Sequence, residues 1–362
     1  FLSATPHNGH SNSFSALLEI LDPQRFCRGV SVKPKMLESV LVRRLKDDLR
    51  EIVGGFAKRV VTEITISGLP EDAPELSLAI LLDKYRSLRE TRLRDENKRI
   101  QAAAGLLVTG LQQRMLSSIE AFARTLHIHR KTVKRQWEEY QQKAESKAIC
   151  LPSLDLISGG LSNDDEKVAL SENELQQEED AQFEGASSAT MGPIHNADAQ
   201  TIFAQEQELL NEMHSIAEAS RGRPDARVTK IIDWIKEHMC PELGKPGASY
   251  TNIRAIIFTE YDDTRRYLQQ QLQAAIAGSD KADQRIKVYF GQTPQTEREE
   301  IKHAFNADPK KHPVRILLAT DAAREGLNLQ AHCWNLFHFD VPWNPSRMEQ
   351  RNGRIDRKLQ PN

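Results

Sequence analysis

The feature that most constrains the fold lies in the last third of the chain, where short apolar runs alternate with amphipathic helical segments. Almost wholly apolar strands that alternate with helices are typical of a parallel sheet covered on both faces, with ligands at the carboxyl ends of the strands. This alternation therefore predicts one α/β domain over residues 225–362. The expected strands are 253–259, 286–290, 314–320 and 334–339, and the expected helices are 227–239, 262–276, 296–305 and 346–357.

The middle of the chain has a different character. Residues 75–147 contain almost no glycine or proline, and their apolar residues recur at helical spacing, which predicts a module of long helices. Its exposed faces are expected to be basic at 84–99 and 124–147. A solvated helix face is the ordinary explanation for such a cluster, and contact with phosphate is the functional alternative. The four residues of the second cluster that we single out for DNA contact are Arg130, Lys131, Lys134 and Arg135.

An acidic stretch interrupts this helical pattern. Between Asp155 and Glu184 there are ten acidic residues and one basic residue, and few are apolar. Such a composition predicts a disordered or loosely helical insert, which we extend as low-complexity sequence to about residue 199. A further helix is expected at 202–216, and residues 222–224 end the middle region. The predicted organisation is thus 1–70, 71–224 and 225–362.

The chain opens on a segment that resembles the end of a buried strand. Residues 1–6 have neither a charged start nor the apolar centre of a secretion signal, so we expect a fragment that begins inside a folded domain. A helix is expected at 13–21, and the β-branched alternation of 60–66 predicts a strand.

Composition excludes several classes of protein. The chain is 39% apolar and 28% charged, and no apolar run approaches the roughly 20 residues that span a bilayer. With 49 Lys and Arg against 51 Asp and Glu, the net charge is −2, so nucleic-acid binding would need local clusters of charge.

His10 has no partner at metal-ligand spacing, and we expect no metal site. Four separated cysteines form no CxxC pair and favour a reducing, cytoplasmic compartment.

The strongest candidate site is the segment 349–357. Arg351, Arg354 and Arg357 are three residues apart, so on a helix they would share a face that also presents Gln350. Guanidinium groups at the edge of a parallel sheet suit the neutralisation of charge on a transferring phosphoryl group. The alternative is an amphipathic surface helix whose arginines form salt bridges with the acidic residues of the same segment.

Two further segments follow expected strands and carry small hydroxyl residues. After the third strand of the α/β domain, the Thr320 hydroxyl and nearby backbone N–H groups could face a phosphate. The alternative is an ordinary turn in which Thr320 and Asp321 cap the next helix. At the start of the chain, Leu2–Pro6 carries Ser3 and Thr5, for which a simple hydrogen-bonded turn is the alternative.

Together, these segments resemble the superfamily 2 helicase-like ATPases, specifically the Swi/Snf type. Residues 13–26 and 43–49 are similar to the stretches that follow motif III in that family. The sequence Trp343-Asn344-Pro345 before 350–357 resembles the RapA-like branch, from which Asn352 and residues 358–360 depart. The loop 6–14 resembles the Swi/Snf-type helicase of the bacterial DISARM anti-phage system. In order along the chain, motif III is similar to 2–6, motif IV to 256–259, motifs V and Va to 319–330, and motif VI to 350–357.

The resemblance implies a two-lobed RecA-like motor that closes on ATP and moves along duplex DNA. The resemblance also implies that Arg354 and Arg357 contact the γ-phosphate and that Gln350 helps to position them. The remaining roles that it implies fall into three groups. They are nucleotide binding by Asp321, Gly326 and Arg351, contact with a DNA strand by Thr320 and Asn328, and coupling of the two sites by Ser3 and Thr5.

One absence limits what this chain could do by itself. No GxxxxGK[ST] loop and no Asp-Glu-Ala-His or similar acidic strand end for Mg²⁺ occurs in it, so the ligands of an ATP-bound Mg²⁺ would lie outside. We therefore expect the second RecA-like lobe, a helical insertion and the tail of the first lobe, inactive without the missing N-terminal lobe. The expected setting is the bacterial cytoplasm, with double-stranded DNA and other defence-system subunits as partners and no membrane.

Two alternative functions remain open from the sequence. The first is a non-catalytic module that docks DNA or a protein, with a purely structural arginine cluster. The second is an ATPase that separates strands or acts on RNA.

Overall fold

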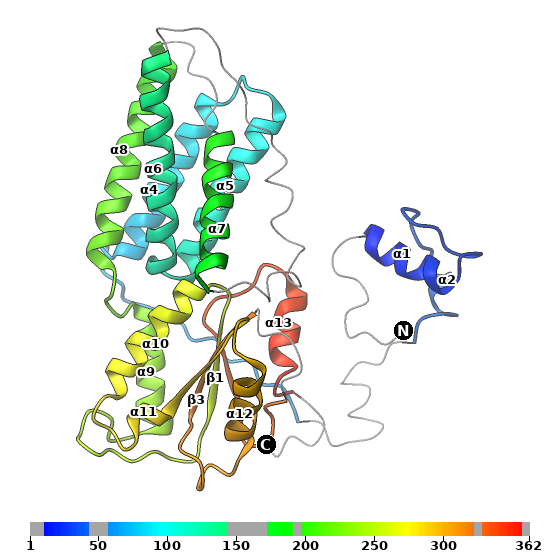
Figure 1. The fold of residues 1–362 in the computed structure, drawn as a ribbon, viewed down its shortest axis with the longest axis vertical. Coiled ribbons are helices and arrows are strands. Elements are labelled where there is room, and N and C mark those ends of the chain that lie inside the picture. Colours follow the sequence, from blue (N-terminus) through cyan, green and yellow to red (C-terminus); the bar gives the residue numbers. More distant parts are fainter. Residues whose placement is uncertain (1–10, 43–56, 144–171, 191–196, 322–327, 357–362) are drawn as a thin grey trace.

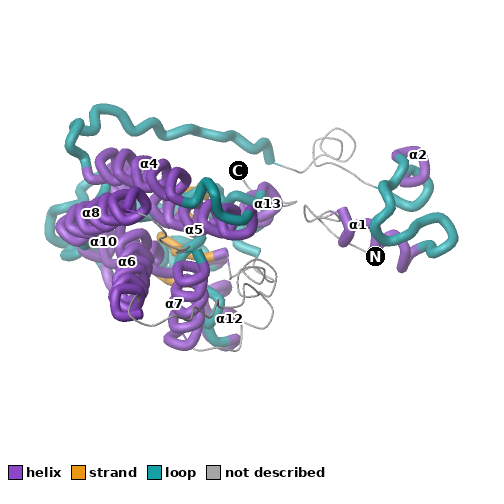
Figure 2. Tube along the Cα trace, turned by 90° about the horizontal axis from the view of Figure 1, so that it is seen from above, coloured by secondary structure: helices purple, strands orange, loops and turns teal. Residues whose placement is uncertain are grey.

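The computed structural model describes residues 11–42, 57–143, 172–190, 197–321 and 328–356. Figure 1 shows a bundle of long helices standing on a smaller α/β unit. The helices α1 (Ser11–Leu21) and α2 (Pro34–Leu37) lie apart from both units, as Figure 2 also shows from a second direction.

The α/β unit is built on a four-stranded sheet with the order β2-β3-β1-β4, in which every neighbouring pair is parallel. The two central strands have no exposed residue, which explains their unbroken apolar sequences, whereas the edge strands are partly exposed. Thr259 pairs with Thr320, so β1 and β3 end side by side. The strands are β1 (Ala255–Thr259), β2 (Ile286–Tyr289), β3 (Ile316–Thr320) and β4 (Asn335–His338).

Helices cover both faces of this sheet. Alternate residues of β1 and β3 point to opposite faces, so Ile257 and Leu318 join one core and Ile256 and Leu317 another. The first core includes α9 (Ala226–Trp234), a π-helical turn at Ile235–Met239 and α10 (Asp262–Ile276). The second includes α12 (Gln295–Asn306), and a short helix α11 (Ala282–Arg285) precedes β2.

The bundle encloses a separate core. Leu78, Leu111, Phe122 and Leu210 are completely buried in it, each on a different helix. Its acidic helix α7 packs on the bundle through Phe183 and Ala186, so this part of the predicted low-complexity insert is a packed helix. The helices are α4 (Pro74–Arg92), α5 (Lys98–Ser117), α6 (Ile119–Lys143), α7 (Glu172–Ala189) and α8 (Ala197–Ser220). None of the described helices is long and apolar enough to cross a membrane.

Three local predictions are wrong. Residues 60–66 form no strand, because no described strand pairs with them, and Val60 and Val61 are 78% and 80% exposed. The helix expected at 346–357 is α13 (Pro345–Asn352), so Arg354 lies in the turn beyond it and not on a helical face shared with Arg351. The basic face expected at 84–99 is also interrupted, because Arg89 is buried inside the bundle.

Candidate functional site

Arg351 is at the centre of a buried polar cluster at the carboxyl end of the sheet. Its side chain is 2% exposed and donates to both carboxylate oxygens of Asp321, at 2.5 and 2.8 Å, and to the Asp340 carbonyl at 2.7 Å. Burial opposes the charge of Arg351, but hydrogen bonds and Coulombic attraction from both aspartates outweigh burial and raise its pKa. Since Asp321 follows β3 and Asp340 lies just beyond β4, one side chain connects α13 to two strand ends.

Asp340 accepts hydrogen bonds from three segments of the chain. Its Oδ2 accepts hydrogen bonds from the hydroxyls of Thr259 and Ser117, both at 2.6 Å. Its Oδ1 accepts the Glu260 N–H at 2.9 Å and Arg351 Nη2 at 3.3 Å. A buried carboxylate with donors on both oxygens is held in one orientation. Asp340 therefore joins the ends of β1, β4 and α13 to the last residue of α5.

Three more ion pairs hold α13 and the turn that follows it. Arg347 donates to Glu260 at 2.8 Å, and burial raises the pKa of Glu260 although Arg347 opposes this rise. Arg59, in the extended segment before the bundle, donates to both oxygens of Glu349 at 2.8 and 3.1 Å and to Asp356 at 2.7 Å. Glu349 and Asp356 are the acidic residues that the sequence suggested as partners of the α13 arginines. Both are bound instead by Arg59, which precedes them by 290 and 297 residues.

The turn after α13 contacts the segment that follows β3. The carbonyl of Arg354 accepts the Leu329 N–H at 3.1 Å, and the Arg354 side chain is 9% exposed. Asn328 and Gln350 are exposed, and the Asn328 carbonyl accepts a hydrogen bond from Asn306 at 2.6 Å. The structure therefore brings the two strongest sequence segments together through their backbones.

Thr320, at the end of β3, carries a buried hydroxyl for which the described residues supply no hydrogen-bond partner. It is 4% exposed, and within the described part of the chain its Oγ1 has no hydrogen-bond partner. His338, at the end of β4, is hydrogen-bonded through Nε2 to Asn352 Oδ1 at 2.9 Å, and burial lowers its pKa. A buried hydroxyl without a described partner can donate to an acceptor such as a phosphate oxygen. Across the described ranges, no group of three or more His, Cys, Asp and Glu residues could hold a metal ion.

The basic residues selected on α6 do not form one free surface. Arg130 donates to Asn211 of α8 at 3.0 Å, and Arg135 pairs with Glu184 of α7 at 2.6 Å. Lys131 and Lys134 are exposed, and Lys134 lies 3.9 Å from Glu138. Two of the four positions therefore connect helices of the bundle.

Four of the predicted residues, Ser3, Thr5, Gly326 and Arg357, lie outside the described residues. Conversely, sequence reasoning missed Asp340, Ser117 and Arg59. Asp340 carries a usable signal, since it is an acidic residue directly after a predicted strand, as Asp321 is. Ser117 and Arg59 carry none, because their partners are distant in sequence.

Comparisons with known proteins found a family model, a relative and a solved structure that are similar to parts of this chain. Residues 234–358, which include the whole four-stranded sheet, match the family described as helicase conserved C-terminal domain. A segment of 104 residues, 29% of this chain, is 38% identical to the uncharacterized ATP-dependent helicase YqhH of Bacillus subtilis (strain 168) and covers 16% of that protein. A similar solved structure is the Pyrococcus furiosus Hef helicase domain, with a TM-score of 0.38, 14% identity and coverage of 80% of this chain and 51% of that one.

Proposed function

We propose that this chain is the second-lobe part of an ATP-dependent DNA translocase of the Swi/Snf type. The observation that carries the proposal is the Arg351 cluster, which holds α13 and the turn bearing Arg354 against the carboxyl ends of β1, β3 and β4. In a parallel α/β sheet, that edge is where ligands bind. Bound ATP with Mg²⁺ would supply the phosphoryl group for transfer, with the Mg²⁺ ligands outside this chain.

Within this proposal, the residues of α13 have different tasks. Arg351 is already occupied by two carboxylates, so it fits a positioning role at the nucleotide site together with Asp321. Arg354 and Arg357 would face the γ-phosphate from the opposite lobe, with Gln350 beside them. An arginine supplied across a cleft makes hydrolysis depend on lobe closure.

The cellular setting is part of the same proposal and rests on the sequence resemblance. It comprises the bacterial cytoplasm, double-stranded DNA, a DISARM-like anti-phage system and its other subunits. The missing N-terminal lobe would supply the phosphate loop.

DNA-stimulated ATP hydrolysis tests the function. We expect the complete protein to hydrolyse ATP, this chain alone to be inactive, and activity to return when the chain is mixed with an upstream half that carries the phosphate loop. Arg354→Ala should lower kcat by roughly 10³-fold, which is the lower range for an arginine finger. Arg86→Ala, which changes an exposed side chain of α4, is the matched control and should leave kcat unchanged.

A second outcome would support a docking module instead. If the complete protein binds duplex DNA in a salt-sensitive manner but shows no turnover, or if Arg354→Ala changes DNA affinity without changing the rate, the motor proposal is wrong.

For the DNA interface, neutralising the exposed pair Lys131 and Lys134 should reduce the slope of log affinity against log salt by roughly 2. An unchanged slope would remove α6 from that interface.

A further inference from the structure

The corner between α5 and α6 is inserted into the polar cluster at the carboxyl end of the sheet. Ser117, the last residue of α5, is 1% exposed and donates to Asp340 Oδ2 at 2.6 Å. The completely buried hydroxyl of Thr264, in the first turn of α10, lies 2.7 Å from the hydroxyls of both Ser117 and Ser118. Ser118 Oγ also accepts the Ala121 N–H at 3.1 Å, so it caps the start of α6.

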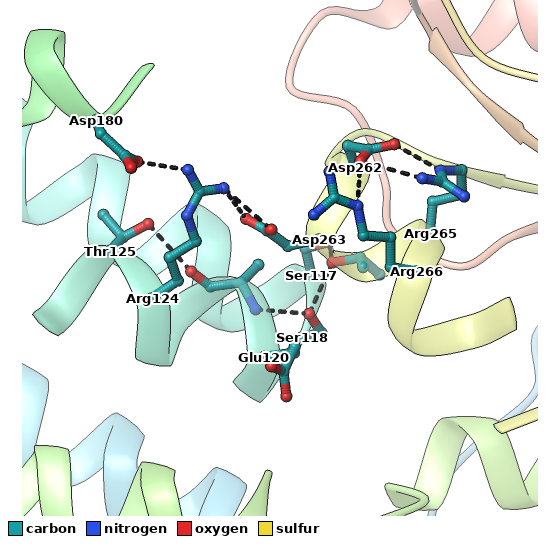
Figure 3. Close-up of polar contacts among 12 residues, drawn as sticks. Ser117, Ser118, Glu120, Arg124, Thr125, Asp180, Asp262, Asp263, Arg265 and Arg266 are labelled. Atoms are coloured by element: carbon teal, nitrogen blue, oxygen red, sulfur yellow. Dashed lines mark hydrogen bonds and ion pairs between the residues drawn. The ribbon is translucent and has the colours of Figure 1, made fainter. Parts of the chain in front are cut away.

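Ionic contacts hold the same corner from the side. Figure 3 shows Arg124 of α6 between Asp263 and Asp180. Its guanidinium donates to both oxygens of Asp263 at 3.0 Å and to Asp180 of α7 at 2.6 Å. Arg114 of α5 lies over the Tyr261 ring, with 4.8 Å between the guanidinium carbon and the ring centroid. Two helices of the bundle are therefore fixed to the segment that starts α10.

These contacts form one continuous chain of hydrogen bonds. Thr264 holds Ser117, Ser117 donates to Asp340, and Asp340 accepts from Arg351. A network of buried, fully bonded groups has few alternative arrangements, because every displaced group would leave a partner unsatisfied. A movement of the α5–α6 corner must therefore be transmitted to α13 or must break the chain of bonds.

We propose that Ser117 is a positioning residue for the arginine-bearing α13 segment, and that the helical bundle controls that segment through Asp340. The inference rests on the proposed function for its catalytic readout. Without the Ser117 hydroxyl, Asp340 loses one of the donors that fix its carboxylate, and Arg351 loses a rigid acceptor. The bundle is then a built-in regulator of the arginine site, and a DNA or protein ligand that displaces the α5–α6 corner changes the ATPase rate.

Kinetics and amide hydrogen exchange on the complete protein test this inference. We expect Ser117→Ala to lower kcat by roughly tenfold with the KM for ATP within about twofold, because small displacements of catalytic groups act on the chemical step. Amides of residues 345–352 should exchange faster in Ser117→Ala than in the natural protein. Ser87→Ala is the matched control, since among the described residues that exposed hydroxyl bonds the Asp83 carbonyl of its own helix, at 3.0 Å, and no other group.

A second variant covers the case in which Ser117→Ala does not fold. Thr264→Val is nearly isosteric and removes the hydroxyl that holds Ser117, so it should move kcat and the exchange of 345–352 in the same direction, by less. An unchanged kcat, or faster exchange confined to the α5–α6 corner, would overturn the inference. An inactive natural protein would instead refute the proposed function, and the exchange experiment would still decide the coupling.

Discussion

The two ends of the sheet both contain buried arginines, yet their acceptors differ. At the amino end, Arg254, Arg285 and Arg315 are 0%, 4% and 4% exposed and bond mainly to backbone carbonyls. At the carboxyl end, Arg351 is 2% exposed and bonds to two aspartates. Burial of an arginine is therefore not in itself a sign of function. The groups that accept its hydrogen bonds show whether the guanidinium only satisfies nearby backbone carbonyls or also connects distant segments of the chain.

Among the described contacts, Arg254 and Arg315 lack the carboxylate partners that Arg351 has, whereas Arg285 also pairs with the Asp280 carboxylate at 2.7 Å. Arg254 donates to the Val314 carbonyl at 3.1 Å and to the Ala307 carbonyl at 2.7 Å, with no carboxylate bonded to it among the described contacts. Burial lowers the pKa of Arg254 and that of Arg315 to about 10, whereas the pKa of Arg351 is raised. Carbonyl dipoles thus satisfy the geometry of a guanidinium, while carboxylates also neutralise its charge.

The largest effect should come from Arg351→Ala. This change leaves two buried carboxylates without their cation, which typically costs about 3–5 kcal/mol of unfolding free energy. Urea denaturation of the complete protein measures it, and ATPase activity should be lost as well. A loss below about 1 kcal/mol would mean that the carboxyl-end cluster is no more than a surface contact.

Arg254→Met should cost somewhat less and should separate stability from function. The substitution keeps much of the apolar stem but leaves several carbonyls unsatisfied, so we expect a loss of about 2–3 kcal/mol. ATPase activity per folded molecule should stay unchanged, in contrast to Arg351→Ala. If Arg254→Met abolished hydrolysis in protein shown to be folded, the two ends of the sheet would not differ in the way described.

Arg59→Ala probes the ionic contacts on the outer side of α13. Arg59 is 34% exposed and pairs with Glu349 and Asp356, and exposed pairs contribute up to about 1 kcal/mol. The loss should disappear at high salt, because salt screens exposed charges. Arg86→Ala, which removes a single exposed pair with Glu90, is the control with a smaller expected effect. A salt-independent loss would indicate packing of the Arg59 stem instead of charge.

The smallest effect concerns pH, and it acts at both ends of the sheet. Burial lowers the pKa of His338 at the carboxyl end and of His312 at the amino end from the ordinary value of 6.5. Below pH 6.5 the unfolded chain therefore binds more protons than the folded chain, and stability falls as the pH decreases toward the folded pKa. The raised pKa of Glu260 opposes this trend at the carboxyl end.

His338→Gln isolates the contribution of the carboxyl end. Gln can still bond to Asn352 but does not titrate, so the decrease in unfolding free energy between pH 6.5 and 5 should become shallower. Charges facing His338 come from Arg351, Asp321 and Asp340, and the variant keeps all three. Equal slopes for the variant and the natural protein would assign the pH dependence to other groups.

Much of the sheet was predictable because its central strands are buried on both faces. The strand 253–259 and the helix 262–276 are found as β1 and α10, where apolar periodicity and burial coincide. The strand predicted at 60–66 does not form. A β-branched alternation forms a strand only where a neighbouring strand supplies hydrogen bonds. Local sequence does not contain that information.

The candidate site was only partly predictable. Sequence reasoning located Asp321, Arg351 and Arg354 because they follow an apolar strand or recur at regular spacing. It placed Arg351 and Arg354 on one helical face, but α13 ends at Asn352, and its last turn directs Arg351 into the interior. The contribution of Ser117 depends on a contact between residues 223 positions apart, which no spacing rule indicates.

The connections of the bundle to the sheet unit lie next to each other. Residues 69–75, where the chain enters the bundle, and 220–226, where it leaves, line one cavity of about 330 Å³ with Tyr267. The Tyr267 hydroxyl donates to the Arg223 carbonyl at 2.8 Å and accepts the Asp225 N–H at 2.7 Å. During evolution, a segment joined at one such point can be gained, lengthened or exchanged without rethreading the strands. The bundle is therefore attached to the sheet unit at two places, this pair of junctions and the α5–α6 corner.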